Sequence, residues 1–519
     1  MKKLFYILIV FQLLCVGCFE DESNLNIRKI NPIEIEMFGG NQLLVKQMDT
    51  LKVEPLIYCE GVPDSELSFE WMFMNYGTMV PRLLDTTMYC CAQITEKPGK
   101  NYTLRLTVTD RTTGIFRIQT YMVNVGSNFD AGLLIADTKD GGVTSDLNLV
   151  KCREFNADYA LENETRDVYR NMWESVNGAS FGGEILAAQT ANAWSQNTSV
   201  TVVTTQDLYR ANYKDYVWEW TGDQMFYVKP PFSGQELQSA TFAFRTNNVW
   251  EAMMVNGLFF QRNLQNNGRQ YGYPVYPSGV KEYAVSMMCL PLGTGLYPVY
   301  CYDAIGKRML FFYNESGYKP VDQLGGPFDV NDLSGYDPLF LGQSAEGMTF
   351  MVKNRNSGAY QALVMNVVLG ADVAGATKFA KNVYDLSAAS NIGDARFYAL
   401  NRQGNAVYYA TETAVYAGPL DHMSDAKLRW SAGIGETITG IRLYDWTGGK
   451  HYYMGAEEKE DSQESADRML LITTQNAKGE GKVTAVPVLH QNIGQLEQNK
   501  KYQVVLEGFG KILGIYKQL

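Results

Sequence analysis

Few side chains of this sequence have the types and the spacing that catalysis requires. The three histidines, His422, His451 and His490, are in neither an HExxH pattern nor another metal-ligand spacing. The sequence has no Gly-x-Ser-x-Gly elbow, phosphate-binding loop or dinucleotide-binding glycine motif. A glycosidase pair could come from any of the 56 Asp and Glu residues, which is no specific signal. We therefore expect no enzyme, no metal and no cofactor.

One oxygen-rich loop could hold Ca²⁺. It contains five residues with side-chain oxygens, Asp329, Asn331, Asp332, Ser334 and Asp337. The loop lacks the final bidentate glutamate of an EF-hand. We favour an ordinary turn with Asx hydrogen bonds, and Ca²⁺ binding remains the alternative.

Two aromatic stretches are candidates for ligand recognition, because flat amphipathic rings stack on sugars and on peptides. The first stretch, residues 213–220, is favoured as core packing. The second, residues 268–277, places its tyrosines among Gly and Pro and is favoured as an exposed loop. The candidate ligand-binding residues are Trp218, Trp220, Arg269, Tyr271, Tyr273 and Tyr276.

The N-terminus carries the one motif with a specific chemistry. Lys2 and Lys3 precede an apolar run that ends at Val16, which is too short for the roughly 20 residues of a transmembrane helix. Cys18 follows Gly17, an arrangement that resembles a bacterial lipoprotein box, in which the cysteine thiol is acylated and becomes the new N-terminus. We expect a signal peptide at 1–17 and a lipidated tether at 18–29; ordinary signal cleavage is the alternative.

Composition agrees with a secreted protein. Removal of residues 1–17 leaves 43 Lys and Arg against 56 Asp and Glu, a net charge of −13, so we expect no nucleic-acid partner. Six further cysteines make disulfides possible: Cys59 with Cys90 or Cys91, and Cys289 with Cys301. Buried free thiols are an equal alternative.

Residues 30–126 show the alternation of short β-strands. Strands are expected at 33–36, 51–54, 67–71, 102–108 and 119–123. Alternation with period two and intervening turns predicts a β-sandwich, with Trp71 in its core.

The runs Phe69-Glu70-Trp71, Gly99 to Asp110 and Thr113-Gly114 resemble the PKD-type immunoglobulin-like module. Together with Cys18 in front, they resemble the PKD-like family lipoproteins. That resemblance implies an association with SusC/SusD-type outer-membrane nutrient importers, and it covers residues 1–150 specifically.

Residues 127–519 continue strand after strand. Strands at 396–400, 406–410 and 414–418 look like most of a propeller blade, with positive φ angles expected at the Gly404-Asn405 turn. Similar openings at Phe350, Phe397 and Ile441 are 47 and 44 residues apart, within the pitch of propeller repeats. The chain is therefore expected to be all-β, a sandwich followed by a propeller of about seven blades. The strand at 511–516 is expected to complete the first blade. An elongated sandwich or a β-solenoid is the alternative.

The functional prediction combines these features. We expect a lipid-anchored outer-membrane protein that faces the cell exterior and serves a SusC/SusD-type TonB-dependent importer as an accessory subunit. It would bind an oligomeric ligand, with oligopeptide favoured over oligosaccharide because of the resemblance, or it would brace the complex. A glycan-binding lipoprotein, a propeller-based hydrolase with carboxylates at its axial opening, and a purely structural or adhesive module are the alternatives.

Overall fold

The computed structural model describes residues 32–36, 40–75, 80–129, 131–152, 154–155, 166–193, 197–245, 250–264, 270–292, 296–320, 325–375, 378–445 and 466–518. Cys18 and Arg269 lie outside these residues. The chain divides into two compact units, Met1–Gly126 and Ser127–Leu519. No helix among the described residues is long and apolar enough to cross a bilayer.

The first unit is a β-sandwich, as the alternation predicts. Its larger sheet has the order β2-β9-β8-β5-β6, and β1-β4 and β3-β7 form two smaller pairs. The strands are β1 Ile33–Glu36, β2 Gln42–Lys46, β3 Thr50–Val53, β4 Leu56–Cys59, β5 Leu67–Asn75, β6 Pro81–Asp85, β7 Cys90–Gln93, β8 Gly99–Asp110 and β9 Phe116–Gly126.

Trp71 lies in the core of this sandwich, as expected. Its side chain is fully buried and stacks on Tyr121 with ring centroids 6.3 Å apart. The indole Nε1 donates a hydrogen bond of 2.9 Å to the carbonyl oxygen of Thr87, so its polar atom is paired inside the core.

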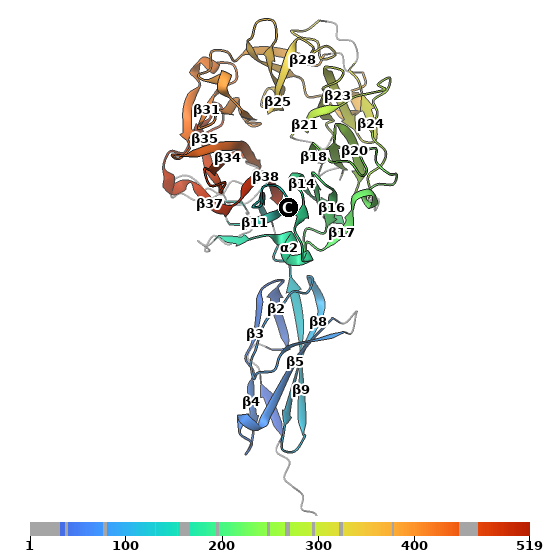
Figure 1. The fold of residues 1–519 in the computed structure, drawn as a ribbon, viewed down its shortest axis with the longest axis vertical. Coiled ribbons are helices and arrows are strands. Elements are labelled where there is room, and N and C mark those ends of the chain that lie inside the picture. Colours follow the sequence, from blue (N-terminus) through green and yellow to red (C-terminus); the bar gives the residue numbers. More distant parts are fainter. Residues whose placement is uncertain are drawn as a thin grey trace, which may run out of the picture. The chain divides into compact units, whose positions relative to one another are not determined.

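The second unit contains seven antiparallel sheets among its described residues, arranged as the blades of a propeller (Figure 1). Blades 1 to 3 comprise β10 Gly132–Thr138, β11 Thr144–Lys151, β12 Asp167–Tyr169, β13 Phe181–Gly182 and β38 Lys511–Gln518; β14 Ile185–Ala193, β15 Asn197–Thr204, β16 Leu208–Ala211 and β17 Trp218–Thr221; and β18 Ala240–Arg245, β19 Trp250–Val255 and β20 Leu258–Asn263. The helix α2, Met172–Asn177, follows β12.

Blades 4 to 7 follow in chain order. They comprise β21 Val285–Cys289, β22 Val299–Asp303, β23 Arg308–Tyr313 and β24 Ser316–Tyr318; β25 Tyr336–Ser344, β26 Gly347–Asn354, β27 Tyr360–Met365 and β28 Ala380–Asp385; β29 Phe397–Leu400, β30 Ala406–Ala410, β31 Ala414–Pro419 and β32 Lys427–Ser431; and β33 Glu436–Asp445, β34 Ala466–Asn476, β35 Gly481–His490, β36 Gln495–Leu496 and β37 Val504–Phe509. Short 3₁₀ turns lie at Asp64–Glu66, Gly222–Met225, Gly370–Asp372, Ile392–Asp394, Met423–Asp425 and Lys500–Tyr502.

The ring is closed by the last strand of the chain, as the sequence predicts. β38 pairs with β10 in an antiparallel ladder from Gly132↔Gln518 to Thr138↔Lys511. The innermost strands β38, β14, β18, β21, β25, β29 and β33 each contact the next one around the ring, and β33 contacts β38 again. Closure leaves the ring without an open blade.

Apolar side chains fill the spaces between blades. Strands such as β10 and β30 are buried at every position, because each sheet packs against a neighbour on both faces. One consequence is visible at Gly404. It does not have the positive φ expected of it; instead, a Cβ atom there would collide with the backbone oxygen of Gln491. Close packing therefore requires this glycine.

Two further expectations need correction. Phe350 lies on β26, the second strand of its blade, whereas Phe397 and Ile441 lie on first strands, so the 47-residue spacing joins positions that are not equivalent. Cys289 and Cys301 do not form a disulfide, because Cys289 is opposite Tyr300 and Cys301 is opposite Met288. Neighbouring ladder positions place the two thiols on opposite faces of the sheet.

Cys90 and Cys91 are free thiols, which excludes the predicted pairings with Cys59 in this structure. Burial raises the pKa of the Cys90 thiol to about 12, so it remains protonated at neutral pH.

Candidate functional site

Tyr271 is the predicted ligand-binding residue whose position the structure contradicts. It is fully buried between blades 2 and 3, packed with Phe226 and Phe260. Its hydroxyl donates a hydrogen bond of 2.9 Å to the Glu251 carboxylate. Tyr271 was expected in an exposed loop because Gly and Pro surround it, but its backbone pairs with Phe226 in a parallel bridge that draws the side chain inward.

Two arginines complete the buried group around Tyr271. Arg262 forms an ion pair with Glu251 and donates a hydrogen bond of 2.7 Å to Ser199. Arg210 lies over the Tyr271 ring, 5.3 Å from its centroid. Burial and the positive charge of Arg262 lower the pKa of Arg210 to about 10, so both guanidiniums remain charged at neutral pH. This group joins blades 2 and 3 and has no access to a ligand.

The first aromatic stretch, residues 213–220, contains both buried and exposed rings. Tyr213 and Tyr216 are buried, as the core interpretation predicts, and Trp218 is 52% exposed. Trp220 is half-buried, and the Arg210 guanidinium lies 5.5 Å from its ring centroid. Of the two tryptophans, Trp218 is therefore the one whose ring is available to a partner.

The other two predicted tyrosines are exposed. Tyr273 is 69% exposed and Tyr276 is 49% exposed. Tyr227, which sequence reasoning missed, is 63% exposed, and its backbone N–H donates a hydrogen bond of 3.0 Å to the carbonyl of Tyr271. A tyrosine two residues before Lys229-Pro230-Pro231 was the available signal. We call Tyr227, Tyr273 and Tyr276 the tyrosine surface.

The loop that carries Tyr273 and Tyr276 is fixed along its length. Backbone bridges join Tyr271 to Phe226 at one end and Pro277 to Gly317 at the other. Between them, the Val275 N–H donates a hydrogen bond of 2.9 Å to the carbonyl of Phe259. The exposed rings thus project from an ordered backbone, which reduces the entropy lost when a partner binds.

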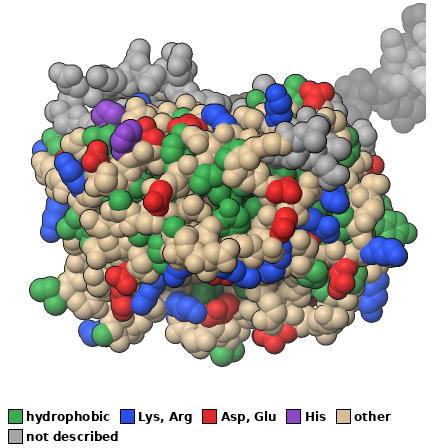
Figure 2. All heavy atoms as spheres, turned by 90° about the horizontal axis from the view of Figure 1, so that it is seen from above, with side chains coloured by type: hydrophobic (Ala, Val, Ile, Leu, Met, Phe, Trp, Pro, Cys, Tyr) green, Lys and Arg blue, Asp and Glu red, His purple; other side chains and the backbone are tan. Residues whose placement is uncertain are grey.

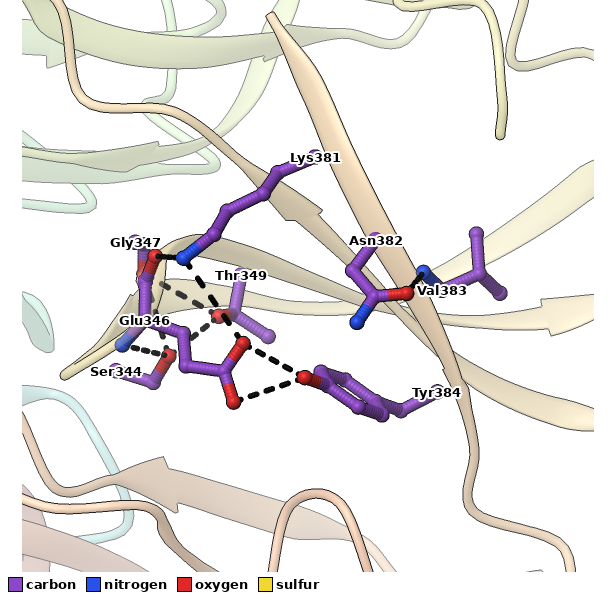
Figure 3. Close-up of polar contacts among 8 residues, drawn as sticks. All are labelled: Ser344, Glu346, Gly347, Thr349, Lys381, Asn382, Val383 and Tyr384. Atoms are coloured by element: carbon purple, nitrogen blue, oxygen red, sulfur yellow. Dashed lines mark hydrogen bonds and ion pairs between the residues drawn. The ribbon is translucent and has the colours of Figure 1, made fainter. Parts of the chain in front are cut away.

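A second polar group lies on blade 5, where the β25–β26 hairpin meets β28 (Figure 3). The Tyr384 hydroxyl lies 2.9 and 2.7 Å from the two carboxylate oxygens of Glu346. Lys381 Nζ donates a hydrogen bond of 2.6 Å to the carbonyl oxygen of Glu346. Burial and the contact with Glu346 raise the pKa of Tyr384. Because these groups satisfy one another, the arrangement ties the hairpin to the outermost strand of its blade.

The predicted oxygen-rich loop forms Asx turns. The Asp329 carboxylate accepts a hydrogen bond from the N–H of Asn331 at 2.8 Å, and Asp332 accepts one from the N–H of Ser334 at 3.1 Å. Asp337 instead pairs with Arg355 at 2.8 Å. Within the described residues, no group of three His, Cys, Asp or Glu side chains is placed to hold a metal ion.

Figure 2 shows one face of the molecule, on which acidic and basic side chains are interspersed. No single sign of charge gathers over this face, although the whole chain is acidic.

Comparison with known proteins gives one family match. Residues 18–184 match the PKD-like family, a range that includes the whole described sandwich and continues through β10 to β13. No curated protein matches the chain significantly. With its PKD-like N-terminal domain and its ring of sheets, the protein is an all-β protein of the sandwich-plus-propeller kind.

Solved structures resemble the chain at low identity. A quinonprotein alcohol dehydrogenase-like protein from Bacteroides thetaiotaomicron has a TM-score of 0.43 at 12% identity, covering 93% of this chain and 97% of its own. A putative 6-phosphogluconolactonase from Bacteroides uniformis has a TM-score of 0.31 at 11% identity, covering 87% and 99%. The WD40 domain of SCAP from fission yeast has a TM-score of 0.31 at 10% identity, covering 62% and 74%.

Proposed function

We propose that the protein is a lipid-anchored binding protein that holds an oligomeric ligand on its tyrosine surface and performs no turnover of its own. The observation that carries the proposal is the contrast within one short loop. Tyr271 is buried and fixes the loop, whereas Tyr273 and Tyr276 are exposed on it. Exposed aromatic rings on an ordered backbone are typical of binding surfaces.

The ligand class that we propose is an oligopeptide. Tyrosine rings stack on peptide side chains and backbone, and their hydroxyls provide hydrogen bonds. The same chemistry suits a sugar face, so an oligosaccharide is the other outcome that the experiment must separate. The preference for peptide rests on the resemblance of the first 150 residues to PKD-like lipoproteins.

We further propose that Cys18 anchors the protein in the outer membrane, facing outward, beside a SusC/SusD-type TonB-dependent importer. The support is the lipoprotein-like sequence at Gly17-Cys18 and the PKD-like match that begins at residue 18. Acyl chains contribute about 0.8 kcal/mol per buried CH₂ group, enough for a stable anchor when more than one chain is attached.

Binding by a double variant tests the proposal. The variant Tyr273→Ala/Tyr276→Ala should lose at least about tenfold in affinity for a defined oligopeptide library, measured by calorimetry with the purified ectodomain. The matched control is Tyr58→Ala/Tyr89→Ala, which removes two exposed tyrosines from the sandwich unit. Equal binding by both variants would refute a role for the tyrosine surface. If the unmodified ectodomain binds an oligosaccharide and the double variant loses that binding, the ligand class is glycan rather than peptide. Steady cleavage of either ligand by the unmodified ectodomain would show that the protein is an enzyme.

A further inference from the structure

Arg442 occupies an unusual position in the propeller. It lies on β33, one of the seven innermost strands, and the next two residues, Leu443 and Tyr444, are buried. Its own side chain is exposed, and its Nη1 donates a hydrogen bond of 2.5 Å to the carbonyl oxygen of Ile515 on β38. Ser286 on the innermost strand β21 is exposed as well. Both side chains on these innermost strands are therefore accessible to water.

The hydrogen-bond partner of Arg442 places its guanidinium at the inner edge of the ring, because Ile515 belongs to the innermost strand β38. Desolvation by the surrounding protein lowers the pKa of its guanidinium, and the positive charge of Arg402 lowers it further. The guanidinium therefore lies between two innermost strands of the closed ring, β33 of blade 7 and β38 of blade 1.

A second arginine, Arg402, belongs to the neighbouring blade 6, and its charge acts on Arg442. Arg402 follows β29 of blade 6, and Asp467 lies on β34 of blade 7. Their charges both act on the thiol of Cys289, which lies on β21 of blade 4. The ion pair and this thiol thus come from three different blades.

Among the described residues, the two arginines differ in whether they have an acidic partner. Arg402 forms an ion pair of 2.7 Å with the Asp467 carboxylate, and that carboxylate also accepts the backbone N–H of Arg402. Within the described residues, no carboxylate lies within ion-pair distance of Arg442. The guanidinium has five N–H donors, and among described groups only Nη1 meets a protein acceptor. Among the described residues, Arg442 thus has no ion-pair partner, and its remaining donors are available to a ligand.

We propose that the axial opening binds a small oxyanion, a carboxylate or a phosphate, at Arg442. The planar guanidinium presents parallel N–H donors whose spacing matches two oxygens of either anion. Partial enclosure strengthens the attraction relative to bulk water. Ile515 holds one edge of the guanidinium, and this contact fixes the orientation of the remaining donors. The site is independent of the tyrosine surface.

Titration of the full mature chain in detergent tests this site. The probes are inorganic phosphate and acetate, each added at constant ionic strength against sodium chloride, with calorimetry and the melting temperature as readouts. We expect saturable binding of at least one probe, and the preferred probe identifies the class of anion. Arg442→Gln should weaken binding at least about tenfold, and Arg442→Lys should lose part of it, because an ammonium lacks the parallel donors.

The matched control is Arg396→Gln, which removes an exposed arginine paired with Glu412 at 3.0 Å and should leave binding unchanged. In buffer without the probes, Arg442→Gln should melt close to the unmodified chain, because the loss of the hydrogen bond to Ile515 is offset by the removal of repulsion from Arg402. The absence of saturable binding in the unmodified chain, or unchanged affinity in a folded Arg442→Gln or Arg442→Lys, would overturn the proposal. The variant Tyr273→Ala/Tyr276→Ala should retain anion binding, which separates this site from the proposed function.

Discussion

The hydroxyl of Tyr271 and the carboxylate of Glu251 form a hydrogen bond of 2.9 Å in the fully buried interface between blades 2 and 3. Tyr271→Phe would remove the donor and leave a buried carboxylate oxygen without it. We expect a loss of about 1–3 kcal/mol in the free energy of unfolding, measured by urea denaturation. Tyr273→Phe, two residues away and exposed, is the control and should change stability by less than about 0.5 kcal/mol. Equal stability of both variants would show that the hydroxyl contributes nothing.

Closure of the ring depends on Gln518. Its Nε2 donates to the carbonyls of Phe129 at 3.0 Å and Tyr213 at 3.1 Å, and its Oε1 accepts from the Tyr216 hydroxyl at 2.8 Å. Gln518→Ala would leave these buried groups unpaired, so we expect a loss of about 2–4 kcal/mol in the free energy of unfolding.

Lys511→Ala is the control for Gln518→Ala at the other end of β38. It breaks only a half-exposed ion pair with Glu184 at 2.8 Å, for which about 0–1 kcal/mol is typical. If the two variants unfold at the same urea concentration, the buried hydrogen bonds of Gln518 do not stabilise the closure of the ring.

Stability should depend on pH through Asp146. Its carboxylate accepts backbone N–H groups of Leu147, Trp173 and Glu174 at 2.7–3.0 Å, but burial outweighs them and raises its pKa from 3.8 to about 6. Because the folded state then holds the proton more tightly than the unfolded state, this group adds stability as the pH falls from about 7 to about 4. That stability is lost as the pH rises through 6.

The measurement is urea unfolding between pH 4 and pH 7.5, comparing the unmodified chain with Asp146→Asn. The difference in the free energy of unfolding between the unmodified chain and Asp146→Asn should change by up to about 3 kcal/mol across this pH range. Asp140→Asn is the control, because hydrogen bonds from Thr144 lower the pKa of Asp140 to about 2 and place its titration below the range. Parallel curves for the unmodified chain and Asp146→Asn would contradict a raised pKa.

Cys18→Ala should release the protein from the membrane if Cys18 carries the acyl chains. Cell fractionation and mass spectrometry of the mature N-terminus measure this directly. Protease treatment of intact cells, with a periplasmic protein as control, tests whether the anchored chain faces outward. An unmodified N-terminus at another residue would contradict lipidation.

The strand pattern was predictable because alternation and turn residues are local signals. They predict the sandwich around Trp71, the strands near Phe397 and the pairing of the C-terminal strand with the segment that begins at Gly132. The phase of the propeller repeat was less predictable. Phe350 and Phe397 open similar apolar strands, and only the hydrogen-bonded ladders distinguish a first strand from a second.

The sites were predictable only in part, because exposure depends on distant partners. Tyr271 and Tyr273 share one Gly- and Pro-rich segment, yet Tyr271 is buried by its bridge to Phe226 and by Glu251. A glutamate within the otherwise apolar run Trp250–Val255 was the signal that a buried polar partner existed. For Arg442 the corresponding signal was a single charge inside the apolar strand around Ile441, but which side faces the axis is decided by the closed ring.

The ladder between Gly132 and Gln518 also determines how the propeller would bear mechanical load. A pull on the chain before Gly132 reaches β10 directly, and β10 is not an edge strand, since β11 lies on one side and β38 on the other. Extraction of β10 must break both ladders together along the strand direction rather than one bond at a time. If the protein is tethered through its N-terminal segment in moving fluid, the force therefore acts on the propeller at a strand that resists mechanical unfolding.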